Sequence, residues 1–263
     1  MLFRSKPTLF SSFTIDLGPL YVERVLDGLL TLSGITGVKR MKETERYEKS
    51  LLYLKRLIPD CSRNQYTFIQ FYLGYYNQQL AKETVVPNHT RHYQEKALCH
   101  YQNFLDLPPL ADESRFYAQW QSGMLQEELG YPWEMASASL LGACDIDPLR
   151  GESLQQIVMH YTQARDWRSA YEYSLQSMEK HFDRNPIAAR RWFVNFKAYD
   201  WNLLNTHLKI CYKLGYSKEA GTVYKRMVDY ERKHLAEFAN LDIRRIHSLE
   251  KLFHRSQPVL ATA

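Results

Sequence analysis

Glycine and proline are scarce in this chain of 263 residues, with 11 and 10 copies respectively. Few turn-forming residues disfavour a β fold, in which short strands alternate with turns rich in Gly and Pro. Hydrophobic residues make up 45% and charged residues 24% of the sequence. That share is enough to bury a core, and it excludes a wholly disordered chain. We therefore expect an all-α protein built from long helices.

Cysteine is also rare, and no two copies are close enough in sequence to form a Cys-x-x-Cys redox or zinc motif. The cysteines inside helical stretches have apolar neighbours, which is typical of reduced core residues in a cytoplasmic protein. His207 and Cys211 are four residues apart, so one helix would bring them into contact. A thiolate nucleophile needs an orienting third group, so packing is the favoured interpretation of this pair. The four cysteines are Cys61, Cys99, Cys144 and Cys211.

The sequence has no long apolar run, so we expect neither a signal peptide nor a membrane span. Its net charge of +5 is mild, and acids alternate with bases, which disfavours nucleic acid as a partner. It contains no phosphate-binding glycine loop and no metalloprotease or serine-hydrolase motif. His89, His92 and His100 are interpreted as ordinary surface residues. These absences predict that the protein is not an enzyme and uses no cofactor or metal.

What the sequence does contain is a helical pattern that recurs four times, with small residues at matched positions. A small side chain lets two helix axes approach to about 8–10 Å where the helices cross. We expect Gly123, Ala136, Ala170 and Ala220 at such crossings. A longer connection, about 81–92, is expected to form an outward loop in the first repeat. The four repeats lie at about 64–109, 114–148, 151–182 and 201–232, within residues 61–232.

Other segments flank these repeats. Residues 1–38 carry several glycines among β-branched residues and are expected to be irregular or to contain short strands. Self-association through this N-terminal segment is one hypothesis. Residues 39–60 are expected to form a packing helix, 233–255 a capping helix and 256–263 a loose tail. Between the third and fourth repeats, the basic and aromatic residues 184–201 are interpreted as a linker.

The spacings resemble the tetratricopeptide repeat (TPR), whose roughly 34-residue unit is a pair of helices. The match covers about residues 64–232. The resemblance implies a right-handed α-solenoid of stacked helical hairpins. Its supporting residues include Leu73, Gly74, Ala97, Tyr101, Pro109, Gly123, Gly130, Ala136, Ala143, Pro148, Leu154, Tyr161, Ala170, Gly215, Ala220 and Tyr224.

A narrower resemblance links the proline-containing turn at 129–134 to the repeats that follow the catalytic domain of bacterial family 2 glycosyltransferases. Residues 194–201 and Leu2-Phe3-Arg4 share this likeness. The sequence departs from that family because the nucleotide-sugar half and its metal-binding Asp-x-Asp motif are missing. Asp145-Ile146-Asp147 matches the Asp-x-Asp pattern, but it is expected at a helix end and is not interpreted as a metal site. The likeness implies an accessory TPR module, or a truncated remnant, of such an enzyme.

The repeat pattern also predicts a binding surface, because the first helix of each TPR pair lines the concave side. An aromatic end and an amide-rich, basic end would suit a protein or peptide with an apolar part and an acidic part. We therefore expect a non-catalytic scaffold or adaptor. A structural subunit of a large assembly is a further alternative, as is packing of the aromatic residues against residues 1–38 or a second copy. The groove residues are Phe68, Phe71, Tyr75, Tyr117, Trp120, Met124, Gln155, Met159, Gln163, Asn202, Asn205, Lys209 and Lys213.

Overall fold

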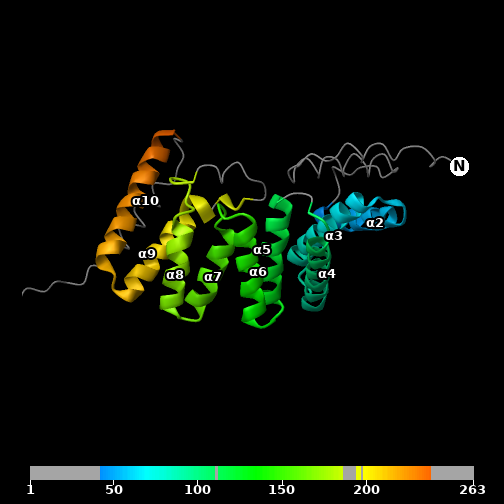
Figure 1. The fold of residues 1–263 in the computed structure, drawn as a ribbon, viewed down its shortest axis with the longest axis horizontal. Coiled ribbons are helices and arrows are strands. Elements are labelled where there is room, and N and C mark those ends of the chain that lie inside the picture. Colours follow the sequence, from blue (N-terminus) through cyan, green and yellow to red (C-terminus); the bar gives the residue numbers. More distant parts are fainter. Residues whose placement is uncertain (1–41, 110–111, 186–193, 197, 238–263) are drawn as a thin grey trace, which may run out of the picture. The chain divides into compact units, whose positions relative to one another are not determined.

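The computed structural model describes residues 42–109, 112–185, 194–196 and 198–237, which form helices and no strand (Figure 1). The prediction of an all-α chain is therefore confirmed for this part of the sequence. Segment 1–38, the capping helix beyond residue 237, the tail 256–263 and the core of the basic linker lie outside it. The chain divides into two compact units, Met1–Asp147 and Pro148–Ala263, which we describe separately.

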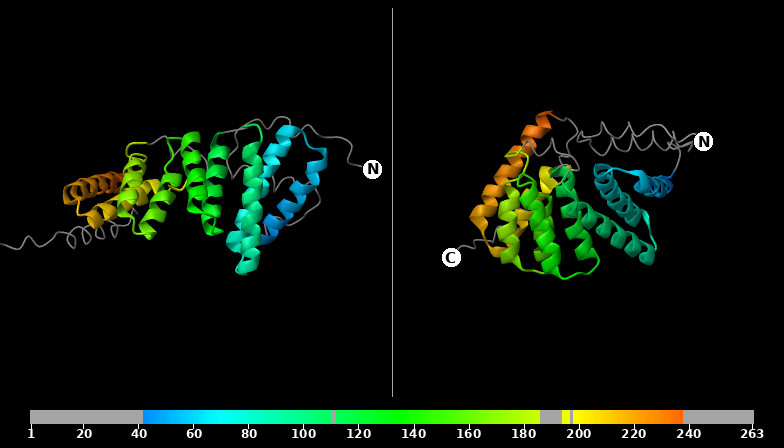
Figure 2. Two further views of the ribbon diagram at one scale, coloured as in Figure 1. Left: turned by 60° about the horizontal axis from the view of Figure 1, so that its bottom comes forward. Right: turned by 45° about the vertical axis from the view of Figure 1, so that its right-hand side comes forward.

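In the first unit, each helix packs against the next one along the chain, and α3 also contacts α5 (Figure 2). Its buried core is rich in aromatic rings, among them Phe71, Tyr101, Phe104 and Phe116. Large rings supply most of the apolar area that holds such hairpins together. The elements are α2 (Glu43–Leu57), the 3₁₀ turn η3 (Ile58–Asp60), α3 (Arg63–Glu83), α4 (Pro87–Asp106), α5 (Asp112–Glu128) and α6 (Trp133–Ile146).

In the second unit, α7 packs on α8, α8 on α9 and α9 on α10. Leu204, Leu208 and Met227 belong to the core between α9 and α10, and Ile210 packs with Val158 and Ala170. The elements are α7 (Glu152–Gln163), α8 (Trp167–Met178), the π-helix η5 (Ala198–Asn202), α9 (Leu203–Leu214) and α10 (Ser217–Glu237). The last helix thus continues past residue 232.

Local sequence explains where α3 and α4 begin. Ser62 accepts a hydrogen bond from the Gln65 amide, and the Gln65 side chain accepts one from the Ser62 amide, which forms a capping box. Pro87 is the first residue of α4, where its missing amide hydrogen costs nothing. The prediction of a long loop at 81–92 is therefore wrong, since only residues 84–86 separate the two helices.

Three of the turns between paired helices close in the same way. Gly130, Arg165 and Gly215 each adopt a left-handed conformation, with φ of 81°, 60° and 76°. The residue after each one donates its amide hydrogen back into the preceding helix, to the carbonyls of Gln126, Tyr161 and Cys211. This is the hydrogen-bond pattern of a Schellman helix end. Arg165 is the one non-glycine residue of the three, so this turn carries backbone strain.

Small residues do lie at the helix crossings where the sequence places them. A Cβ atom added to Gly123 would lie 2.7 Å from Leu140 and 3.0 Å from the carbonyl oxygen of Ala136. Ala136, Ala170 and Ala220 are fully buried. A larger side chain at any of these positions would force the paired helices apart.

The start of the second unit is fixed by a buried polar cluster that the sequence did not suggest. Tyr199, in the π-helix, accepts the amide hydrogen of Gly151 at 2.8 Å and donates to Glu152. Glu152 pairs with Arg150 at 2.6 Å, and both side chains are shielded from solvent. Burial and the Glu152 carboxylate raise the pKa of Tyr199 well above its usual range.

Candidate functional site

In the first unit, the expected groove residues divide into an accessible set and a buried set. Phe71 and Tyr117 are 2% and 6% exposed, so they belong to the core and present no side chain to a partner. The half-buried set comes from α3 and α5, which contact each other. These four residues, which we call the aromatic face, are Phe68, Tyr75, Trp120 and Met124.

The buried Tyr117 ring packs against two members of the aromatic face. The Tyr117 ring lies 5.8 Å from that of Trp120 in an edge-on arrangement and 6.2 Å from that of Tyr75. The indole nitrogen of Trp120 is buried, and it finds no hydrogen-bond acceptor among the residues that the structure describes. An aromatic anchor held rigid by neighbouring rings is the kind of residue that contributes most to protein interfaces.

A polar network under this face was not anticipated from the sequence. The hydroxyl groups of Tyr101 and Tyr117 both donate to the amide oxygen of Gln78, at 3.0 Å and 3.4 Å. The Gln78 amide nitrogen in turn donates to Gln121. The network joins α3, α4 and α5 inside the core. Gln78 is one of several polar residues that α3 buries, and these amide side chains were the available signal, because a buried amide needs hydrogen-bond partners.

In the second unit, the expected groove residues lie on α7 and at η5 and α9. Met159, Gln163, Lys209 and Lys213 are exposed, whereas Gln155, Asn202 and Asn205 are half-buried. The Lys213 ammonium lies 5.8 Å from the centre of the Trp167 ring, a cation–π contact that holds the lysine in place. Lys209 therefore remains the more available of the two charges for an acidic partner.

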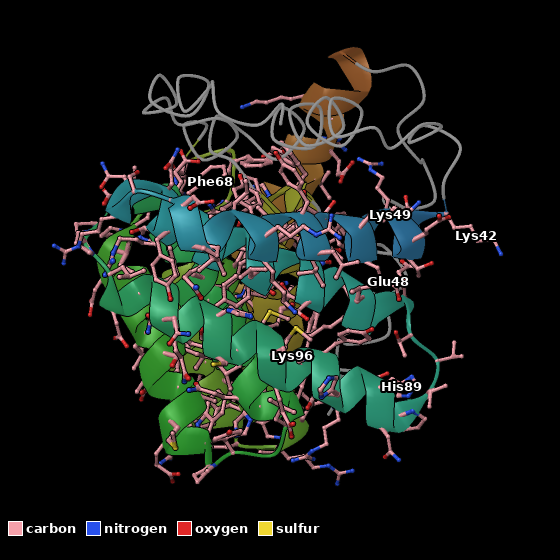
Figure 3. The ribbon with its side chains drawn as sticks, turned by 90° about the vertical axis from the view of Figure 1, so that its right-hand side faces the viewer. Lys42, Glu48, Lys49, Phe68, His89 and Lys96 are labelled. Atoms are coloured by element: carbon pink, nitrogen blue, oxygen red, sulfur yellow. The ribbon has the colours of Figure 1, made fainter. Side chains whose placement is uncertain are left out.

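The three histidines of α4 do not form a cluster. His89 and His92 lie in its first turns, and Figure 3 shows His89 away from Lys96 along the same helix. His100 instead shares a hydrogen bond of 2.8 Å with Gln70, and burial lowers its pKa. Cys99, expected in the core, is exposed, because it faces away from the buried Ala97 and Leu98 side of α4.

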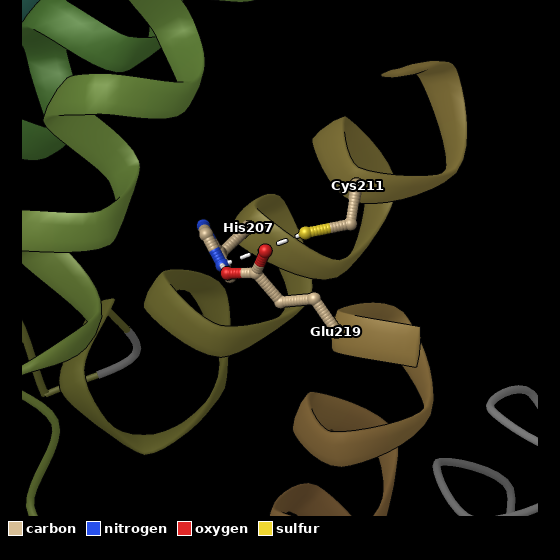
Figure 4. Close-up of side chains that lie close together, drawn as sticks. All are labelled: His207, Cys211 and Glu219. Carbon is tan, nitrogen blue, oxygen red and sulfur yellow. Dashed lines mark hydrogen bonds and ion pairs between the residues drawn. The ribbon is translucent and has the colours of Figure 1, made fainter. Parts of the chain in front are cut away.

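One cluster does bring chemically reactive side chains together. The prediction that His207 and Cys211 touch is confirmed, since the Cys211 sulfur lies 3.5 Å from His207 Nε2. Glu219, in the first turn of α10, adds a carboxylate oxygen 3.1 Å from the same nitrogen (Figure 4). The sequence did not reveal this third member, because it lies on the partner helix of the hairpin. The His207 and Cys211 side chains are buried, and the Glu219 side chain is 32% exposed.

The surroundings of this cluster decide its protonation. Burial, reinforced by the Glu219 carboxylate, raises the pKa of the Cys211 thiol to about 12. Burial also lowers the pKa of His207, against the opposing effect of Glu219. The hydrogen bond to Glu219 raises the pKa of Tyr171 to about 12. A thiol that keeps its proton at neutral pH is a poor nucleophile, so this group does not resemble a cysteine-hydrolase site.

The chain matches no protein-family model, and a comparison with curated proteins finds no significant relative. The resemblances to TPR proteins and to glycosyltransferase-associated repeats therefore stay predictions. No helix in the described part of the chain is long and apolar enough to cross a bilayer.

Proposed function

We propose that this chain is a non-catalytic, TPR-like helical-repeat protein that binds a segment of a partner protein in the cytoplasm. The observation that carries the proposal is the aromatic face, where residues of the first helices α3 and α5 combine accessible rings with a rigid support. Sequential packing of helical hairpins within each unit also supports it. In a stacked repeat, the first helices form a continuous concave surface for an extended partner.

The aromatic face is tested by replacing Trp120 with alanine in the full chain. A peptide selected from a display library against the wild-type chain serves as the probe, and its dissociation constant is measured by fluorescence anisotropy. Truncation of an aromatic anchor is expected to weaken binding about tenfold or more. Tyr131→Ala is the matched control, because Tyr131 is 43% exposed in the turn between α5 and α6. Equal affinity of the two variants would exclude the aromatic face as the binding surface.

The basic residues of α9 are tested separately, with acidic peptides from the same selection. Lys209→Glu is expected to weaken their binding and to reduce the dependence of affinity on salt, since a charge contact is lost. Lys218→Glu, an exposed lysine on α10, is the control for the change in net charge. If both lysine variants bind like the wild type, then α9 does not contribute to capture of the partner.

An accessory module of a family 2 glycosyltransferase is the second candidate. The proline turn favours it, because Pro132 occupies the N-cap position of α6, two residues after the left-handed Gly130. In this case the chain would bind a glycosyltransferase catalytic domain, and the two would co-purify from the native host. Transfer or hydrolysis of a sugar nucleotide by the isolated chain would instead refute the non-catalytic assignment in both candidates.

A further inference from the structure

The hairpin formed by α9 and α10 contains three different metal-ligand types directed at one point. His207 Nε2 and Cys211 Sγ come from successive turns of α9, and Glu219 Oε1 comes from the first turn of α10. The three ligand atoms all lie within 4.8 Å of one another, and no other group of this kind occurs in the described ranges. Figure 4 shows the three side chains converging from the two helices.

Two of the three separations between these atoms are close to those that one ion would need. Bond lengths of about 2.0–2.3 Å in a tetrahedral zinc site place neighbouring ligand atoms about 3.3–3.6 Å apart. In the structure, sulfur and nitrogen are 3.5 Å apart, and nitrogen and carboxylate oxygen are 3.1 Å apart. We propose that His207, Cys211 and Glu219 bind a zinc ion, with the fourth coordination position open to water.

Two further side chains hold the ligands in the orientation that such a site requires. Ser174 Oγ lies 2.8 Å from Nδ1 of His207, on the opposite side of the ring from the cluster. The Tyr171 hydroxyl donates to Oε2 of Glu219 at 2.7 Å, which leaves Oε1 directed at the histidine. Outer hydrogen bonds of this kind fix the ring and the carboxylate in protein metal sites.

The hydrogen bonds of Ser174 also favour a cation at this point. Its hydroxyl donates to the Tyr171 carbonyl at 2.9 Å, so its oxygen is left to accept the Nδ1 hydrogen of His207. The Nε2 lone pair then faces a carboxylate oxygen and the sulfur. Without an ion, the protonated Cys211 thiol donates its hydrogen to Nε2. A zinc ion would replace that proton and leave the Nε2 lone pair, the thiolate and the carboxylate oxygen as its ligands. The partly exposed Glu219 gives an ion access from solvent.

The test uses the full chain, stripped with a chelator and then titrated with Co²⁺ and Zn²⁺. One equivalent of Co²⁺ is expected to produce the near-ultraviolet charge-transfer absorption of a cobalt–thiolate bond, and Zn²⁺ is expected to abolish it. Binding releases the Cys211 thiol proton to solvent. The absence of this absorption in the wild-type chain would overturn the proposal and leave a hydrogen-bonded core cluster.

Variants assign the ligands. Cys211→Ser should lose the absorption, and Glu219→Gln, which keeps an acceptor for Tyr171, should weaken Zn²⁺ binding at least about tenfold in competition with a fluorescent chelator. Cys99→Ser, which alters an exposed thiol on α4, should bind like the wild type. Circular dichroism checks that each variant is folded. Should Cys211→Ser unfold, unchanged Zn²⁺ affinity in Glu219→Gln would still refute the site.

Discussion

Gly74 in α3 lies against the Tyr101 ring in α4, so closely that an added Cβ atom would be 2.7 Å from two ring carbons. Tyr101 is fully buried and donates its hydroxyl hydrogen to Gln78, so the ring cannot move away without losing this bond. The absence of a side chain at Gly74 therefore sets how closely the first hairpin packs.

Gly74→Ala is accordingly expected to destabilise the protein. Overpacking should cost about 1–3 kcal/mol, which exceeds the gain of about 1 kcal/mol from the better helix propensity of alanine. Urea unfolding followed by circular dichroism measures the change. Gly221→Ala in α10 is the control, because an added Cβ there meets no atom within 4 Å. That variant should be neutral or slightly more stable, and an equal loss in both variants would contradict the packing argument.

Arg165 provides the opposite case, a residue whose replacement by glycine should stabilise the protein. Its φ of 60° is costly for a residue with a Cβ atom, and the equivalent turns use Gly130 and Gly215. Arg165→Gly is expected to gain about 0.5–1 kcal/mol, seen as a higher melting temperature. Arg168→Gly, in the first turn of α8, should instead lower the melting temperature, because glycine has a lower helix propensity than arginine. A lower melting temperature for Arg165→Gly would show that the left-handed turn is not strained.

Asp183 should make stability depend on pH. Burial alone would raise its pKa, but the hydrogen bonds from Arg226 and His181 outweigh this effect and hold the pKa well below its usual range. A carboxyl with a depressed pKa contributes stability above its unfolded pKa of about 3.9, and that stability is lost as the pH falls. Asp183→Asn should therefore cost about 1 kcal/mol at pH 7, discounted for partial exposure.

The difference between wild type and Asp183→Asn should shrink as the pH is lowered below the unfolded pKa of the carboxyl. Urea midpoints at pH 7, 5 and 3 measure this trend. A difference in stability that stays constant across this pH range would show that Asp183 does not stabilise the protein through its ion pair with Arg226.

Tyr199→Phe tests the polar cluster at the start of the second unit. The change leaves the Gly151 amide hydrogen without its acceptor and removes the hydrogen bond to Glu152. Buried polar groups that lose a partner cost about 1–3 kcal/mol, and we expect about 2 kcal/mol here. Tyr216→Phe, at a residue 44% exposed, is the control and should change stability by less than about 0.5 kcal/mol. A comparable loss of stability in the control would show that the loss in Tyr199→Phe does not come from the polar cluster.

The helix positions were predictable because turn residues mark them locally. Pro109 and Pro148 follow α4 and α6 within a few residues, and Gly215 ends α9 in a left-handed conformation. The wrong expectation was the long connection, where Val85-Val86-Pro87 suggested an extended loop. Proline has two roles, to stop one helix and to start another, and the sequence does not say which one applies.

The binding residues were harder to predict than the helices. Phe71 lies three residues after Phe68, so the two positions are only about 60° apart around α3, yet one ring is in the core and the other is half-buried. His207 and Cys211 were paired correctly because they share a helix. Glu219 and Ser174 were missed because their approach depends on how α8 and α10 pack on α9, and a sequence period along one helix carries no information about its neighbours.

The π-helix Ala198–Asn202 has a consequence for changes in chain length. A π-turn accommodates one residue more than an α-turn, so deleting one of these residues would let the segment wind as a regular α-helix. The shortened turn would rotate the phenol of Tyr199 by about 100° and carry it away from Gly151. The extra residue of the π-turn thus orients the Tyr199 side chain toward Gly151. A homologue without it would need another contact to hold the start of α7 against the segment that leads into α9.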